Sequence, residues 1–273
     1  FSSVIANGNL TVSSDRIAAG AGVTHILNAL TINGAYSLSF VGGDSVNSGT
    51  AALTFTNNVS LGSNTTFSIT NPVAGGSMLL TLNGIISGAS SLTINGNGQL
   101  NLPNNANSYS GGTTIDSSST LSVAAAGNLG SGAVTFKGGA TLDFTASATI
   151  NNPATLSTLG NATVKVESGV TATLGGVISS GGTNRTLTKS GTGTLILSGN
   201  NTFSDAITVS AGTLVANHAN ALGTTTAGTT VASGATLAIG DGITTASEAI
   251  TVSGTGAFSA LGAMLLGTIV TGL

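Results

Sequence analysis

The sequence lacks cysteine and tryptophan altogether and carries very little charge. Without cysteine, disulfide bonds and thiolate chemistry are excluded. Charged residues make up 5% of the chain, against about 25% in an ordinary globular domain. The five lysines and arginines are scattered, and the formal net charge is -3. Since nucleic-acid binding needs clustered basic side chains, the composition predicts no nucleic-acid partner.

Glycine and apolar residues are abundant instead. Glycine accounts for 41 of the 273 residues, hydrophobic residues for 40%, and the mean hydropathy is +0.44. Low charge goes with disorder only when apolar residues are also scarce, so we expect a packed core. The apolar segment 257–273 is short and interrupted by glycines. A spanning helix needs about 20 apolar residues, so we expect no membrane span.

Short runs that alternate between apolar and polar residues recur along the chain, and this period of two predicts β-strands. Residue pairs such as Asn33-Gly34, Asn83-Gly84, Asn95-Gly96 and Ser233-Gly234 separate the runs and can form turns with positive φ. The predicted strands are Leu10–Val12, Leu30–Ile32, Leu38–Phe40, Leu53–Phe55, Leu80–Leu82, Leu92–Ile94, Leu100–Leu102, Leu121–Val123, Val134–Phe136, Leu142–Phe144, Val164–Val166, Ala172–Leu174, Leu195–Leu197, Ile207–Val209, Leu237–Ile239 and Ile250–Val252.

One long pattern occurs twice along the chain. Leu92–Val123 reads LTINGNGQLNLPNNANSYSGGTTIDSSSTLSV, and Leu187–Val215 reads LTKSGTGTLILSGNNTFSDAITVSAGTLV. Each copy has an alternating run, a Gly-x-Gly turn, a second run, an Asn-rich break with an aromatic residue, and two further short strands. Internal repetition of this kind is typical of a solenoid, whose units bury their apolar faces by stacking on their neighbours.

We therefore predict an all-β fold, a single-stranded parallel β-helix (β-solenoid) that runs continuously over 1–273. Its internal repeat units would span about 84–175 and 176–256, and 257–273 would form an apolar C-terminal end segment. Short strands and turns indicate roughly 20–30 residues per turn of the coil. The competing all-β fold is an up-and-down barrel, whose strands are longer and more regular, at about 10 residues in membrane barrels.

The second copy resembles the autotransporter-associated β-strand repeat, which occurs in passenger domains of large secreted bacterial proteins. The resemblance rests on LTKSGTGTL at 187–195, LSGNNTFS at 197–204, SAGTLV at 210–215 and ANALG at 219–223; Leu92–Val123 matches more loosely. It implies a parallel β-helix, export to the cell surface or the medium, and a role in presenting other elements. The C-terminal translocator barrel of autotransporters has no counterpart after residue 253. This indicates either an isolated passenger segment or a short protein that uses the same repeat.

Three carboxylates are the candidates for acid–base chemistry. Asp116, Asp143 and Glu167 follow one another at intervals close to one turn of the predicted coil, so they could stack on one face. Polysaccharide-cleaving β-helices use carboxylates in this way, and hydrolysis of glycosidic bonds needs two at a defined separation. However, Asp116 aligns with Ser210 and Asp143 with Ala238 when the internal copies are compared. Charges that change between copies are expected to be independent surface or turn residues, so we predict no enzymatic activity.

Other residue types give no stronger site. His25 and His218 stand alone, which argues against a metal site. Asp44 and Asp241 lie in single glycine-rich turns, whereas calcium-binding nonapeptides recur in tandem. Asp44-Ser45 lacks the surroundings of a serine hydrolase. We therefore expect no cofactor.

Three further patterns have structural explanations. Tyr109 and Phe203 occupy equivalent repeat positions, which favours a buried corner anchor over a sugar-binding platform. Asn104-Asn105 and Asn200-Asn201 are expected to point inward and form ladders between turns. Thr-x-Thr pairs, as in 171–173, do not recur at a constant spacing, so we attribute them to β-propensity.

The two ends of a solenoid expose unpaired backbone groups that can pair with another chain. No amphipathic helix or charge caps the C-terminal end after Glu248. A contact between the two ends of different subunits does not close and produces filaments. The residues we predict for this self-association are Phe1, Leu261, Met264, Leu265, Leu266, Ile269, Val270 and Leu273.

The sequence thus predicts a non-catalytic extracellular structural protein, secreted or displayed on a bacterial cell surface. It would act as a scaffold or as a head-to-tail filament subunit, and it could carry adhesive surfaces towards a cell-surface or matrix partner. The alternatives are a glycan-processing β-helix enzyme and an adhesin segment of a longer autotransporter.

Overall fold

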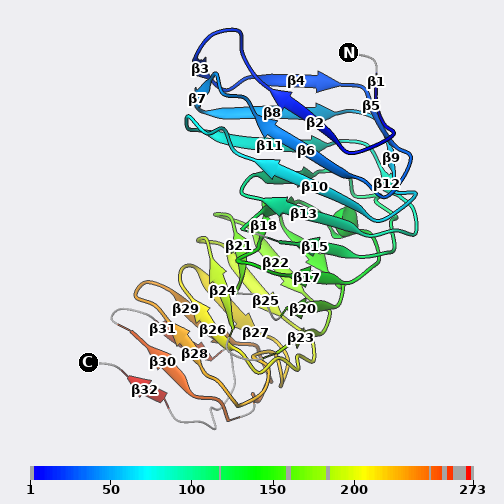
Figure 1. Ribbon diagram of the computed structural model, residues 1–273. Helices are drawn as coiled ribbons and strands as arrows, with labels where there is room; N and C mark the ends of the chain where they lie inside the picture. The colour runs from blue at the N-terminus through cyan, green and yellow to red at the C-terminus, as the bar shows by residue number, and fades with distance from the viewer. Residues whose placement is uncertain are drawn as a thin grey trace. The chain divides into compact units, whose positions relative to one another are not determined.

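The computed structural model describes residues 3–116, 118–157, 161–182, 185–245 and 247–253, together with the backbone of the strands Ala257–Ala260 and Ile269–Thr271. The fold is a parallel β-solenoid, as predicted, and every strand pairing described below is parallel (Figure 1). Parallel pairing excludes the up-and-down barrel, whose neighbouring strands run antiparallel. The chain divides into two compact units, Phe1–Val134 and Thr135–Leu273.

Unit 1 winds as a coil whose turns contribute strands to two main sheets. One sheet has the order β2-β6-β10-β13-β15 and the other the order β4-β8-β11-β14-β16, while β1-β5, β3-β7 and β9-β12 form short pairs. A single 3₁₀ turn, η1, spans Ala126–Leu129. The strands are β1 (Ser3–Ala6), β2 (Leu10–Ser14), β3 (Gly20–Ala21), β4 (Thr24–Leu27), β5 (Ala29–Ile32), β6 (Ser37–Gly42), β7 (Val46–Ser48), β8 (Thr50–Phe55), β9 (Val59–Ser60), β10 (Thr65–Thr70), β11 (Ser77–Leu82), β12 (Ile86–Ser87), β13 (Leu92–Gly96), β14 (Gln99–Leu102), β15 (Thr113–Ile115) and β16 (Thr120–Val123).

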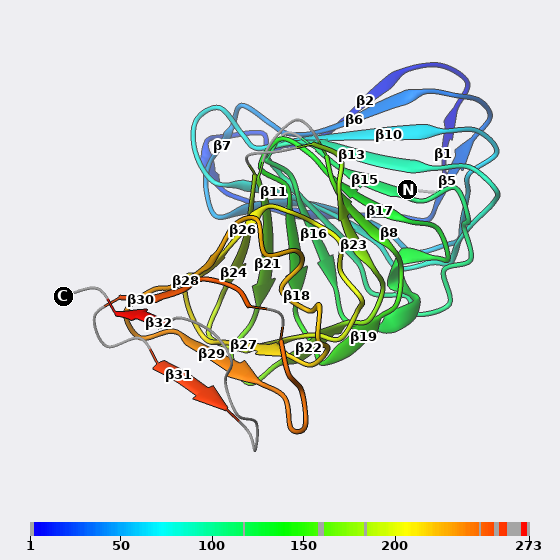
Figure 2. The same ribbon diagram turned by 90° about the horizontal axis from the view of Figure 1, so that it is seen from below.

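Unit 2 has the same architecture. Its sheets have the orders β18-β21-β24-β26-β28-β30-β32 and β19-β22-β25-β27-β29-β31, with β20 and β23 paired. Figure 2 shows β24 and β26 on one side of this coil and β27 and β29 on the other. The strands from the boundary onwards are β17 (Val134–Phe136), β18 (Thr141–Phe144), β19 (Ala148–Ile150), β20 (Ala154–Leu156), β21 (Ala162–Val166), β22 (Thr171–Leu174), β23 (Ile178–Ser180), β24 (Thr186–Ser190), β25 (Thr194–Leu197), β26 (Ala206–Val209), β27 (Thr213–Ala216), β28 (Thr229–Val231), β29 (Thr236–Ile239), β30 (Ile250–Val252), β31 (Ala257–Ala260) and β32 (Ile269–Thr271).

The alternating sequence explains why these segments form strands. Strands such as β11 and β25 alternate buried and partly exposed residues, so the apolar side chains point into the coil and the polar ones point out. The interior is aliphatic, with a few aromatic rings. In unit 1, Phe40 packs edge-on against Phe55 and Phe67, with ring centroids 6.1 and 5.5 Å apart. All three rings are fully buried.

The turns vary in length while the strands stay in register. Among paired residues on neighbouring turns, Leu187 and Ile207 are close in sequence, whereas Ser39 and Ser68 are much further apart. Both intervals fall within the range that the sequence predicts for one turn of the coil. Every one of the sixteen predicted alternating runs lies within a strand of the structure.

The Gly-x-Gly turn of the repeat has a steric reason. Gly96 and Gly191 both have positive φ, +96° and +72°. A Cβ atom added to either would lie 2.1–2.2 Å from the carbonyl oxygen of Ile69 or Val166 on the preceding turn. Only glycine fits there, because the stacked backbones approach so closely.

The repeat boundaries and the turn conformations were also predicted from the sequence. The predicted repeat boundaries, 84–175 and 176–256, and the continuity of one domain over 1–273 remain predictions. The turn prediction is confirmed for two of the four pairs: Gly96 and Gly234 adopt positive φ, whereas Gly34 and Gly84 do not. In the part of the chain that is described, Ser118 is the only non-glycine residue with positive φ. The described part also contains no helix with the length and hydropathy that crossing a bilayer requires.

Candidate functional site

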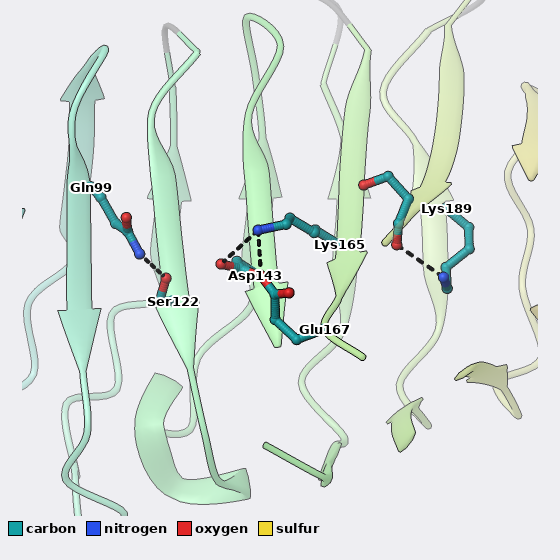
Figure 3. A network of polar contacts seen from close by, with 7 residues as sticks. Gln99, Ser122, Asp143, Lys165, Glu167 and Lys189 are labelled. Atoms are coloured by element: carbon teal, nitrogen blue, oxygen red, sulfur yellow. Dashed lines mark hydrogen bonds and ion pairs between the residues drawn. The ribbon is translucent and has the colours of Figure 1, made fainter. Parts of the chain in front are cut away.

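The structure brings two of the three candidate carboxylates to one lysine. Asp143 on β18 lies directly opposite Lys165 on β21, and Glu167 follows β21 by one residue. The Lys165 Nζ atom lies 3.6 Å from Asp143 Oδ2 and donates a hydrogen bond to Glu167 Oε1 (Figure 3). Asp143 is almost fully buried, whereas the Lys165 and Glu167 side chains are 42% and 44% exposed. Asp116 lies in unit 1, after β15.

This arrangement pairs both carboxylates with a single ammonium group. The hydrogen bond with Glu167 and the charge of Asp143 raise the pKa of Lys165, although partial burial opposes them, so the lysine stays charged. Glycosidic cleavage by two carboxylates needs one of them to donate a proton to the leaving group, whereas here an oxygen of each carboxylate lies within ion-pair distance of Lys165 Nζ. The cluster is therefore suited to holding β18 and β21 together.

Lys189 corrects the prediction that the charges that differ between the copies lie at surfaces or in turns. Its side chain points into the core, where it pairs with Val164 and Val209 on the neighbouring turns, and it is 1% exposed. Nζ donates hydrogen bonds to the carbonyl oxygens of Ser190, Gly191 and Ala211 at 2.7–3.1 Å. Burial lowers the pKa of Lys189 to about 8, because a low-dielectric interior disfavours the ammonium ion.

Three other charged residues of unit 2 are also buried, and one of them, Asp205, contradicts the same prediction. Arg185 and Asp205 form a buried ion pair with Nη1 and Oδ1 3.7 Å apart. Asp205 also accepts hydrogen bonds from the Arg185 backbone N–H and from Ser180 Oγ. Glu248 is buried with one hydrogen bond from Thr229, and burial raises the pKa of Glu248 to about 7. These charges fasten neighbouring turns from inside.

The Asn-rich break of each repeat forms a buried corner. In the second copy, Asn201 accepts a hydrogen bond from the Ile178 N–H at 2.9 Å and donates one to the Ala221 carbonyl at 2.7 Å. Those partners lie on the turns before and after, so one side chain joins three turns. Asn200 is exposed.

In the first copy, Asn107 has the same role. It accepts from the Ile86 N–H at 2.7 Å and donates to the Asn128 carbonyl at 2.8 Å. The predicted members Asn104 and Asn105 are partly and fully exposed, so the prediction was wrong for them. The loop of this copy is longer, and the inward position falls two residues later than the Asn-Asn pair. The partners of Asn107 and Asn201 are backbone groups. The exposed Asn200, in contrast, accepts an amide–amide hydrogen bond from Asn220 on the next turn at 2.8 Å, as a ladder predicts.

The two equivalent aromatic residues are anchors, as predicted. Tyr109 and Phe203 are both fully buried, and their carbonyl oxygens accept hydrogen bonds from Ser131 and Thr224 on the next turn. The Tyr109 hydroxyl contacts Thr113 Oγ1 at 2.6 Å. Burial raises the pKa of Tyr109 to about 12, although the Thr113 contact opposes the shift. Neither ring can serve as a sugar platform.

The remaining candidates stay separate. Within the described residues, no three His, Cys, Asp or Glu side chains gather as metal ligands would. His25 lies on β4 and His218 in the turn after β27, in different units. Asp44 is exposed and precedes β7, and Asp241 is exposed after β29.

The threonines form columns that their sequence spacing conceals. Turns of unequal length bring them into register on the outer face of each sheet of unit 2, so the absence of a constant interval in the sequence was misleading. One column has the order Thr171-Thr194-Thr213-Thr236, and the other the order Thr141-Thr163-Thr188-Thr208-Thr230-Thr251.

The ends bear on the predicted self-association. The first turn pairs on one side only in the described part of the chain: β1 with β5, β2 with β6, β3 with β7 and β4 with β8. Its inward residues Val4, Leu10 and Val12 are partly exposed. At the other end, Ile269 and Val270 lie in β32, which pairs with β30. The other predicted residues, Phe1, Leu261, Met264, Leu265, Leu266 and Leu273, lie outside the described residues.

Comparison with known proteins gives one finding. The family model described as passenger-associated-transport-repeat matches residues 92–123 and 187–216. No curated protein and no solved structure matches the chain. Each matched stretch contains four strands that pair among themselves: β13 with β15 and β14 with β16 in the first, and β24 with β26 and β25 with β27 in the second. One copy of this repeat is therefore a self-paired unit of two adjacent turns.

Proposed function

We infer that this chain, an autotransporter passenger-like β-helix repeat protein, serves as a non-catalytic extracellular scaffold that stacks end to end with further copies. The observation that carries the proposal is the first turn of unit 1, whose strands have a neighbour on one side only among the described residues. An unpaired parallel edge with partly exposed apolar residues is a template for another strand of the same kind.

The geometry of the polar groups supports a structural role. Lys165, Lys189, Asp205 and Asn201 each use their hydrogen-bonding atoms to join neighbouring turns. Repeat units that contact only their neighbours suit an extended support, because length is added without changing the packing. The passenger-type repeat supports a secreted or surface location, and we propose it on that basis.

Electron microscopy of the purified protein tests end-to-end stacking. We expect filaments whose length grows with protein concentration, because the contact does not close. Replacing Val4 and Val12 by lysine places charge on the inward face of the open turn and should abolish filaments. Thr149→Lys on the exposed outer face of β19 is the control and should leave them intact. Monodisperse short particles at all concentrations would contradict the proposal.

The enzymatic alternative has its own test. A glycan-processing β-helix would depend on Asp143 and Glu167, the two candidate carboxylates that lie at Lys165. We expect no release of reducing ends or unsaturated sugars from a panel of polysaccharides. Turnover that disappears in Asp143→Asn or Glu167→Gln would overturn the scaffold assignment.

A further inference from the structure

A row of unbonded asparagine side chains runs along one corner of unit 1. The neighbouring strands β4, β8, β11 and β14 belong to one sheet, and each is followed within three residues by an exposed asparagine. In the described residues, the side chains of these four make no hydrogen bond within the protein. They are Asn28, Asn57, Asn83 and Asn105.

The usual structural reasons for asparagine at a turn do not apply to these four residues. Asparagine is favoured at turns because it tolerates positive φ or because its side chain bonds to nearby backbone. None of the four has positive φ. Their neighbours do fasten the corner: Asn58 accepts a hydrogen bond from the Ile85 N–H, and Asn104 donates one to the Asn83 carbonyl. The corner is thus held by other side chains, and the four amides face solvent.

Two open hollows lie on this corner. One, of about 490 Å³, is lined by Asn83, Pro103, Asn104, Asn105, Ala124 and Ala125. The other, of about 430 Å³, is lined by Ala29, Thr56, Asn57 and Asn58. Both fall in the size range of ligand sites, roughly 300–1,000 Å³. Each combines amides with small apolar surfaces from proline or alanine.

The corner carries no charge. The charged residues of unit 1 in the described part of the chain are Asp15, Arg16, Asp44 and Asp116, and none of them lines either hollow. A charged ligand would find no counter-ion there, and a purely apolar one would leave the amides unpaired. The surface therefore fits a ligand that is neutral and rich in hydroxyl groups.

We propose that this asparagine corner binds an extended neutral oligosaccharide that lies across successive turns of unit 1. Each amide offers a donor and an acceptor side by side, which pair with adjacent sugar hydroxyls. Stacked strands repeat every 4.7–4.9 Å or so, close to the advance of one pyranose ring in an extended chain. Pro103, Ala124 and Ala125 offer a small apolar surface to the C–H face of a ring.

The inference goes beyond the scaffold function and does not depend on end-to-end assembly. It concerns a lateral corner of unit 1, and binding can be measured on unassembled protein. Loss of filaments with sugar binding intact would reject the stacking only, and the reverse result would reject the corner site only.

The test is calorimetric titration of the unassembled full chain with cellohexaose, chitohexaose and mannohexaose, with a heparin-derived hexasaccharide as charged comparator. The variant combines Asn83→Ala with Asn105→Ala. The control is Asn200→Ala, an exposed asparagine after β25 in unit 2 whose side chain accepts one hydrogen bond, from Asn220. Circular dichroism should show equal folding, since the two substituted side chains make no internal hydrogen bond.

We expect at least one neutral hexasaccharide to bind, more tightly than its disaccharide and without dependence on salt. The double variant should weaken binding at least tenfold, and the control should leave it unchanged. Absence of binding by all three neutral sugars at millimolar concentration would overturn the proposal. So would binding confined to the heparin fragment, or binding to a neutral sugar that the double variant does not alter.

Discussion

Single buried polar side chains hold the turns of this protein together. Asn201 and Asn107 each join three turns through backbone partners. Lys189 reaches two carbonyl oxygens in the tight turn after β24 and a third on the next turn of the coil. An aliphatic core holds turns together without fixing which backbone atoms meet. Directed hydrogen bonds at the corners supply that specificity.

Asn201→Ala should destabilise the protein strongly. It leaves the buried Ile178 N–H and Ala221 C=O groups without partners, so we expect a loss of about 2–4 kcal/mol in the free energy of unfolding. Urea denaturation measures it. Asn200→Ala removes an exposed amide and should cost less than about 1 kcal/mol; equal losses for the two would contradict the corner role of Asn201.

Lys189 should make stability rise with pH in mildly alkaline solution. The pKa of Lys189 is lowered to about 8 by burial in the folded state and is about 10.4 in the unfolded state. Between these values the unfolded chain binds more protons, so the free energy of unfolding increases with pH. Denaturation between pH 8 and 9.5 should show this slope, and Lys189→Met should flatten it. An unchanged slope in the variant would assign the effect elsewhere.

Glu248 should make the free energy of unfolding fall with rising pH in mildly acidic solution, the opposite of the effect of Lys189. Burial raises the pKa of Glu248 to about 7, above the value of about 4.3 in the unfolded state. The folded protein then binds more protons between these values, and its stability falls as pH rises from 4.5 to 7. Thermal unfolding of Glu248→Gln should lack this decrease relative to the parent; a parallel curve would show that Glu248 is not the group responsible.

At the scale of the element, close stacking decides which residues a turn accepts. Gly191 and Gly234 both have positive φ, +72° and +80°. A Cβ at Gly191 would lie 2.2 Å from the Val166 carbonyl oxygen, whereas one at Gly234 meets nothing within 4 Å. The two glycines therefore separate the effect of conformation from that of backbone contact.

Gly191→Ala should therefore cost more than Gly234→Ala. Gly234→Ala is the control, and it should lower the free energy of unfolding only by the strain of a left-handed alanine, about 1–2 kcal/mol. In Gly191→Ala the turn must also move away from the Val166 backbone on the preceding turn. We therefore expect a loss in the free energy of unfolding that is larger by about 2 kcal/mol, as for other buried clashes. Comparing the denaturation midpoints of the two variants checks this. Equal midpoints would mean that the backbones do not meet at Gly191.

The alternating pattern of the sequence predicts the strands well but the burial of polar residues only in part. Alternation located sixteen strands correctly, and its phase already placed Lys189 inward, two residues after the buried Leu187. Reading that phase would have revealed the buried lysine. The phase could not predict the burial of Asp143, because this residue points outward from β18 and is nevertheless only 5% exposed. It could not predict the burial of Asn107 either, because a longer loop shifts the inward position.

At the scale of the whole molecule, contacts between neighbouring turns make stability local. Inner turns of unit 2 pair with the turns before and after them, as β24 does with β21 and β26. In such arrays stability is approximately a sum of unit and neighbour terms. A defect therefore weakens its surroundings more than distant turns.

Hydrogen exchange followed by mass spectrometry checks this locality. Asn201→Ala should reduce the protection of amides in β23, β24 and β26, and leave β2, β6 and β10 of unit 1 unchanged. Uniform loss of protection over both units would mean that the chain opens as one cooperative body.

The sequence alone determined the class of fold, since alternation sets strands and repetition forces parallel stacking of similar units. The scattered basic residues also predict no nucleic-acid partner. Only the tertiary structure decided which loop asparagines face inward and which remain unbonded, and it aligned threonines whose sequence intervals differ. The reason is physical: turns of unequal length hide register from any count along the chain, and burial depends on the neighbouring turn as much as on the residue itself.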